Sequence, residues 1–262
     1  MENGFDNVEA IIRHPNAWYF RQFLQNLSAS NLAGREKYSI IRICELNFAG
    51  RYPTPIRLRA MWVLHTLHKT ISESWLSDPD EHIRAWVIRL MMDDQPIDTL
   101  FGPREKALPK INPELVPKLV QQAITDKSGL VRLTLASTLQ RLPVESRGEL
   151  AKALASRSED KNDHNLPLIV WAGIAPLVEF DPEKLLDVAR TTEWSNLRTW
   201  IARAITERSK ENPVAFDNLL ELLRDQPDQA DSLLAGIENG QVSKSLISPY
   251  HALQIKSLKN DK

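Results

Sequence analysis

The stretch DPDEHIRAWVIRL, from Asp78 to Leu90, contains the pattern that decides the fold. A polar turn opens it, an arginine follows in the first turn of a predicted helix, and apolar residues recur at the i, i+3, i+4 spacing of an amphipathic helix. The same pattern returns in DKSGLVRLTLASTL from Asp126 and in WSNLRTWIARAI from Trp194. Looser copies begin at His14, Pro53 and Asp160. A unit that recurs at intervals of tens of residues is typical of an α-solenoid, in which stacked helix pairs bury their apolar faces against their neighbours.

The remaining sequence also favours helix over strand. Only 9 of the 262 residues are glycine, and long stretches lack the alternating pattern of a β-strand. We therefore expect an all-α chain of HEAT-like helical-hairpin repeats, wound as a right-handed α-α superhelix over residues 1–241. A Pro- and Gly-containing loop insertion is expected at 93–112 and a C-terminal tail at 242–262.

Composition excludes several classes of function. Lys and Arg total 33 and Asp and Glu total 34, so the formal net charge of −1 lacks the electrostatic footprint of a nucleic-acid binder. The single cysteine, Cys44, cannot form an internal disulfide, and its apolar helical surroundings predict a buried structural thiol. The longest apolar run, 166–178, is too short to span a bilayer. Residues 1–15 mix Glu, Asp and Arg into their apolar positions, so we expect no cleavable signal in them. We expect no membrane insertion by this segment.

No motif in the sequence predicts catalysis. There is no Gly-rich phosphate loop, no GxSxG, no HExxH and no CxxC or CxxCH. His65 and His68 are three residues apart on one predicted helix, but no carboxylate or cysteine beside them completes a metal site. The sequence therefore predicts no catalytic residue, no cofactor and no metal.

The repeated Asp and Arg residues predict a polar ladder. Asp78 and Asp126 lie at turns, where each can cap its own helix and face the arginine of a neighbouring repeat. The arginines that begin second helices are Arg57, Arg84, Arg132 and Arg198. This ladder would fix the register of the repeats; a binding role is the alternative. In the string DHNLP, Asp163 or Asn165 can cap the helix that Pro167 begins, or contact a ligand or partner.

Tryptophans supply the candidate contact residues. Four of them fall on apolar stripes and are predicted to belong to the core: Trp62, Trp86, Trp171 and Trp200. Three others lie near helix starts or turns, where partial exposure would suit contact with a partner: Trp18, Trp75 and Trp194. Leu100 and Phe101, in the loop insertion, complete the predicted contact surface.

The stretch from Val131 to Val178, with its DHNLP string, resembles the HEAT-repeat region of large exported proteins of planctomycetes and verrucomicrobia. These are labelled PVC-type membrane-bound dehydrogenases or haem-binding proteins. HPNAWYFRQFLQNL, RLRAMWVLHTL and DPDEHIRAWVIRLM fit the same region in the same order, so the resemblance covers most of residues 8–205. In that family a β-propeller precedes the HEAT region and a cytochrome c module follows it. Neither is present here, so no catalytic or haem-ligating residue carries over.

The resemblance implies a periplasmic or exported setting and a scaffold role between redox modules. The leading hypothesis is a non-catalytic protein-interaction module whose partner is a flanking propeller or cytochrome module, or another protein, with no nucleic acid. A second hypothesis is a HEAT-like DNA glycosylase or nucleic-acid-binding solenoid, which would use Trp, Asp and Arg on a basic concave face. A third is a solenoid that binds a small ligand.

Overall fold

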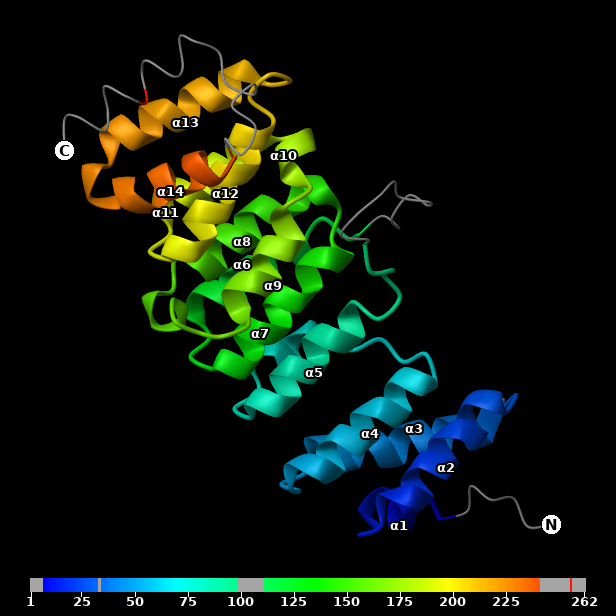
Figure 1. Ribbon diagram of the computed structural model, residues 1–262. Helices are drawn as coiled ribbons and strands as arrows, with labels where there is room; N and C mark the ends of the chain where they lie inside the picture. The colour runs from blue at the N-terminus through cyan, green and yellow to red at the C-terminus, as the bar shows by residue number, and fades with distance from the viewer. Residues whose placement is uncertain (1–6, 33, 99–110, 241–254, 256–262) are drawn as a thin grey trace. The chain divides into compact units, whose positions relative to one another are not determined.

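The computed structural model describes residues 7–32, 34–98, 111–240 and 255 (Figure 1). Within these residues all regular secondary structure is helical and no β-strand occurs, which confirms the all-α prediction. None of the helices described has the length and apolar character needed to cross a bilayer.

The chain forms two compact units, Met1–Asp94 and Gln95–Lys262. The sequence predicts one continuous array over 1–241, whereas the boundary between the units falls inside the predicted insertion at 93–112. Most of that insertion, including Leu100 and Phe101, lies outside the described residues. So does the predicted tail at 242–262, apart from Ile255, which is buried. Each unit is therefore described by itself.

The first unit is built around one central helix. Its helices are α1 (Val8–Arg13), α2 (Ala17–Ala29), α3 (Gly34–Ala49), α4 (Thr54–Thr66) and α5 (Glu81–Met91), with a 3-10 turn at Glu73–Ser77 before α5. The central helix α4 packs against α1, α2, α3 and α5. A helix with apolar residues on most sides must be covered on most sides, as the sequence of α4 predicts.

The second unit consists of paired helices in two layers. Its longer helices are α6 (Leu115–Thr125), α7 (Gly129–Thr138), α8 (Arg147–Ala155), α9 (Leu166–Ile174), α11 (Pro182–Thr191), α12 (Ser195–Glu207), α13 (Pro213–Asp225) and α14 (Ala230–Gly240). A short α10 (Leu177–Phe180) and 3-10 turns at Leu139–Arg141, Val144–Ser146, Ser158–Asp160 and Pro227–Gln229 connect them. In one layer α6, α8, α11 and α13 pack in succession, and in the other α7, α9, α12 and α14 do so.

A recurring arginine fixes the turns that precede four helices. Arg57, Arg84, Arg132 and Arg198 are each the fourth residue of their helix, in α4, α5, α7 and α12 respectively. Three of them donate to the carbonyl oxygen six residues earlier: Arg84 to Asp78, Arg132 to Asp126 and Arg198 to Thr192. The side chains of Asp78, Asp126 and Thr192 in turn accept a hydrogen bond from the backbone N–H two residues later. The donors are Asp80, Ser128 and Trp194, respectively. The same turn is thus built three times by the same local bonds.

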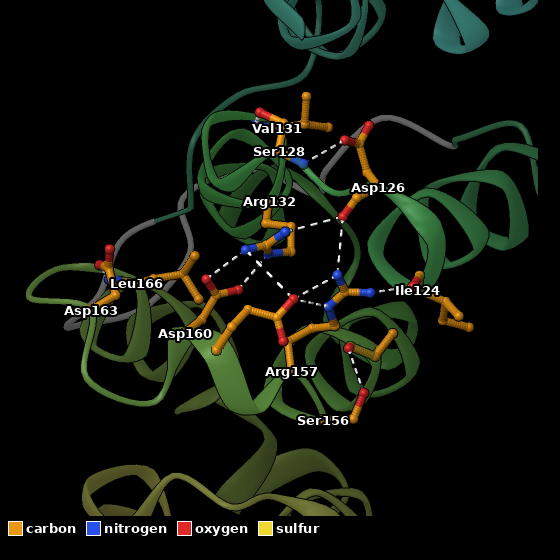
Figure 2. Close-up of polar contacts among 12 residues, drawn as sticks. Ile124, Asp126, Ser128, Val131, Arg132, Ser156, Arg157, Asp160, Asp163 and Leu166 are labelled. Atoms are coloured by element: carbon orange, nitrogen blue, oxygen red, sulfur yellow. Dashed lines mark hydrogen bonds and ion pairs between the residues drawn. The ribbon is translucent and has the colours of Figure 1, made fainter.

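Two of these arginines also bind the turn of the next helix pair. Arg57 forms a bidentate ion pair with Asp78, and Arg132 does the same with Asp160 (Figure 2). The Arg57–Asp78 contact confirms one contact of the predicted ladder, whereas Arg132 binds Asp160, which the prediction did not include, and Arg198 donates to the Ser232 hydroxyl group. One part of that prediction was wrong: Asp78 and Asp126 do not cap their helices. The N-caps are Asp80 and Ser128. The carboxylates of Asp78 and Asp126 instead accept the backbone N–H groups of these two capping residues, before the helix begins.

The DHNLP string begins α9 through its aspartate. Asp163 Oδ1 accepts the backbone N–H groups of Asn165 at 2.8 Å and Leu166 at 2.7 Å, whereas the Asn165 side chain makes no capping bond. The hydrogen bonds from Leu166 and Asn165 lower the pKa of the Asp163 carboxyl group.

We expect Asp163→Ala to lower the free energy of unfolding by about 1 kcal/mol, because it orphans two N–H groups at a helix start. Asn165→Ala is the matched control and should change it little. Because the folded pKa of Asp163 is lowered, its contribution is present above the unfolded pKa and is lost as the pH falls through the folded value. Urea unfolding of both variants at neutral and acidic pH measures this; equal losses for the two would contradict the assignment.

Candidate functional site

The described residues contain no cluster of three or more His, Cys, Asp or Glu that could hold a metal ion. His65 Nε2 lies 3.1 Å from Asp93 Oδ2, and His68 lies beyond the end of α4 with φ of 58°, so the two histidines do not share a helix face. Cys44 is buried, as predicted, and burial raises the pKa of its thiol to about 12. A thiol with so high a pKa is a poor nucleophile.

The main feature of functional interest is a groove in the first unit. It has a volume of about 640 Å³ and runs along α2, α4 and α5. Its lining is predominantly aromatic and aliphatic, with a few polar groups, which is the composition of ligand-binding clefts. The lining residues are Ala17, Phe20, Arg21, Leu24, Pro55, Leu58, Arg59, Trp62, His65, Thr66, Trp86 and Leu90.

Helical periodicity places these side chains on one surface. The α2 residues Ala17, Phe20, Arg21 and Leu24 follow the i, i+3, i+4, i+7 spacing of one helix face. The α4 residues continue the same spacing from Pro55 through to Thr66. Because α4 buries Ala60, Met61, Val63 and Leu64 on its other sides, its apolar character serves two surfaces: a core and a groove.

Aromatic rings form the centre of the groove. The Trp62 and Trp86 rings meet edge to face, with centroids 4.7 Å apart, and the Phe20 ring lies 6.1 Å from Trp62. Arg59 lies over the Phe20 ring and Arg89 over the Trp86 ring, at 5.3 and 5.1 Å from the centroids. These rings present a rigid apolar surface bordered by positive charge.

Some polar groups of the groove have hydrogen-bond partners and one does not. Arg59 Nη1 donates to the carbonyl oxygens of Ile12 at 3.0 Å and His14 at 2.6 Å, which ties α4 to the end of α1. Thr66 Oγ1 donates to the Trp62 carbonyl oxygen at 2.9 Å. In contrast, the Trp62 Nε1–H is buried and has no acceptor among the described residues. A buried donor without an acceptor carries a desolvation cost, so it marks a place where an external acceptor would be favourable.

The structure reverses part of the tryptophan assignment. Trp18 is 52 % exposed, as predicted, and Trp75 is partly buried against the Phe48 ring, with centroids 4.0 Å apart. The predicted exposure of Trp194 was wrong, because this side chain is only 1 % exposed and its Nε1 donates to the Arg157 carbonyl oxygen at 2.9 Å. A side chain directly before a helix can fold back under the preceding turn, and Trp194 does so.

The four tryptophans predicted to be core are only partly buried. They are Trp62, Trp86, Trp171 and Trp200. Two of them form the edge-to-face pair in the groove, and Trp171 and Trp200 pair in the second unit with centroids 6.5 Å apart. Trp86, Trp171 and Trp200 are each the sixth residue of their helix, so a repeated helix position supplies the partly exposed rings.

The two kinds of tryptophan should respond differently to replacement by phenylalanine. We expect Trp194→Phe to lower the free energy of unfolding by about 2 kcal/mol, because it leaves a cavity and removes the hydrogen bond from the indole to the Arg157 carbonyl oxygen. Trp62→Phe should cost less than about 1 kcal/mol, because it removes an N–H that has no acceptor. Urea unfolding followed by circular dichroism measures both. A larger loss for Trp62→Phe would show that its ring belongs to the core.

Comparison of this chain with protein-family models, with curated proteins and with solved structures finds no match.

Proposed function

We propose that this chain is a non-catalytic scaffold of HEAT-like repeats, an α-solenoid, that docks a segment of a protein partner in the groove along α2, α4 and α5. The observation that carries the proposal is the groove itself: it has a volume of about 640 Å³, aromatic and aliphatic side chains and two arginines in its lining, and no acidic lining residue. Stacked helix pairs in two layers suit such a role because they give a stiff extended surface.

The lining of the groove argues against catalysis. Catalytic sites need a nucleophile or a general base held at the reacting atoms. None of the twelve lining residues is a cysteine, serine, aspartate or glutamate. The hydroxyl group of Thr66 is directed to a backbone carbonyl, and the ring of His65 is directed to Asp93, so the two do not form a nucleophile–base pair.

The resemblance to exported redox proteins supplies a setting for this scaffold. On that basis we propose a periplasmic or exported location and a place between a propeller and a cytochrome module, one of which would provide the docked segment. A nucleic-acid partner is less well supported, because residues 1–94 contain eleven Lys and Arg and eleven Asp and Glu and so have no net positive charge.

A peptide-display experiment tests the docking function. A random dodecapeptide library is panned against the full chain and against two Leu→Arg variants of the first unit. Leu58→Arg places a charge inside the groove, and Leu46→Arg, at an exposed position of α3 that is not part of the groove lining, is the matched control.

We expect peptides that bind the wild type and Leu46→Arg and lose at least roughly tenfold in affinity with Leu58→Arg. Circular dichroism checks that both variants fold. Peptides insensitive to Leu58→Arg, or none, would contradict docking in this groove. Salt-sensitive binding of duplex DNA that Leu58→Arg alters would favour the nucleic-acid alternative instead.

A further inference from the structure

We infer that the segment recognised by the groove carries a bulky apolar side chain next to a carboxylate, so that the ligand class is an acidic, apolar peptide. This inference rests on the proposed docking function and adds the chemistry of the occupant. Three independent features of the first unit lead to it: the ring arrangement, the unpaired arginines and the orphan indole donor.

The apolar part of the ligand follows from the rings. Phe20, Trp62 and Trp86 line the groove in one connected cluster, and Leu24 and Leu58 border it. An aromatic or leucine side chain that enters this space gains contacts without reorganising the rings, since these already pack on one another. Anchors of this kind provide most of the binding energy of a protein interface.

The carboxylate follows from the arginines. Arg21 lines the groove, is exposed, and makes no side-chain hydrogen bond or ion pair with another described residue. Arg89 contacts the Trp86 ring and likewise has no carboxylate partner among the described residues. Three arginines of the unit do have one: Arg13 pairs with Glu9, Arg42 with Glu45 and Arg57 with Asp78. Arg59, which also lines the groove, donates to backbone carbonyl oxygens and to no carboxylate among the described residues. A guanidinium group in the groove lining and another over the Trp86 ring complement a carboxylate that lies close to the anchor.

The indole of Trp62 adds a directional requirement. Its Nε1–H is buried and has no acceptor among the described residues. A backbone carbonyl or carboxylate oxygen of the peptide that reaches this group would satisfy it. A purely hydrocarbon ligand would leave this donor unpaired and keep its cost. An acceptor beside the anchor that reaches this donor would therefore strengthen recognition.

A peptide fits these features better than a polyanion does. The unit has no net charge, so only a few local charges can be matched. The apolar surface also continues beyond the groove: Trp18, one turn before Arg21 on α2, is 52 % exposed. A peptide chain can span both the groove and this ring, whereas a small anion would fill only the groove.

The test starts from the displayed peptides that bind in a Leu58-dependent manner. Each is synthesised twice, once as selected and once with its Asp and Glu replaced by Asn and Gln. The affinity of both forms is measured for the wild type, Arg21→Gln and Trp62→Phe by fluorescence anisotropy. Arg42→Gln, an exposed arginine of α3 that already has a carboxylate partner, is the matched control.

We expect the selected peptides to be enriched in aromatic or leucine residues beside Asp or Glu. The amide forms should bind the wild type roughly tenfold more weakly. Arg21→Gln should weaken the acidic form and abolish the difference between the two forms, whereas Arg42→Gln should leave it intact. Trp62→Phe should reduce affinity roughly fivefold while thermal stability stays close to that of the wild type.

The outcomes separate this inference from the docking function. Groove-dependent peptides that bind equally well as acid and amide, or that are basic, would overturn the inference and leave docking intact. An absence of groove-dependent peptides would overturn both.

Discussion

Replacing Asp98 with alanine is expected to destabilise the second unit by about 3–5 kcal/mol, because it removes the carboxylate that pairs with the buried Arg147 guanidinium. The Arg147 side chain is 0 % exposed and that of Asp98 is 3 % exposed, with 2.9 Å between Nη2 and Oδ2. Arg147 also donates to the carbonyl oxygens of Leu142 and Gly173, so one side chain joins three segments. Urea unfolding of the wild type and Asp98→Ala measures the loss.

Two comparisons make this prediction specific to the buried pair. Asp187→Ala breaks an exposed pair with Arg190 and should cost less than about 1 kcal/mol. The double variant Asp98→Ala/Arg147→Met removes both charges and should recover much of the loss. A cost for Asp98→Ala no greater than that for Asp187→Ala would mean that the pair contributes little to the fold.

Replacing Gly236 with alanine is expected to cost about 3 kcal/mol, because α14 packs so closely on α12 that no methyl group fits between them. A Cβ at Gly236 would lie 2.4 Å from the backbone oxygen of Thr199 and 2.6 Å from the Ala202 Cβ. Neither atom is the far end of a flexible side chain, so the helices themselves would have to separate. Thermal unfolding of the variant measures the cost.

Gly129→Ala is the matched control for this close contact. A Cβ there meets only the Arg132 Nη2, at 3.9 Å, at the start of α7. Alanine should therefore change the free energy of unfolding by less than about 1 kcal/mol, in the stabilising direction. Equal losses of stability for Gly236→Ala and Gly129→Ala would contradict the prediction that a steric clash between α12 and α14 is the cause.

Helical periodicity was sufficient to predict that the chain is all-α, because amphipathic stripes are a local property of the sequence. It also predicted that a turn aspartate faces the arginine of a neighbouring repeat, as Asp78 and Arg57 do. It did not name Asp160, which pairs with Arg132. It could not predict the Asp98–Arg147 pair. Asp98 lies in a segment predicted as an insertion, and its partner is 49 residues away.

The groove was also beyond local reasoning, for a different reason. An apolar stripe shows that a residue faces other apolar residues, but not whether they close over it. Trp62 and Trp86 lie on such stripes and yet line an open groove, because the side chains of α2, α4 and α5 leave a space there. Trp194 lies outside any stripe and is enclosed by the turn around Arg157. The burial of a large side chain therefore depends on the third helix or turn, which sequence spacing does not specify.

The fourth-residue arginine has a consequence for how such a gene could grow. Arg132 bonds to its own turn through the Asp126 carbonyl group and to the following turn through Asp160. An in-frame duplication of residues 126–159 would copy this arginine. The Asp126 of the second copy would follow residue 159 of the first copy, so the Arg132 of the first copy would again have an aspartate at a turn to bind. A copy of α9 would bring Ile169 at the equivalent position and no guanidinium. Unequal crossing-over would thus yield a folded, longer protein more readily at α7 than at α9.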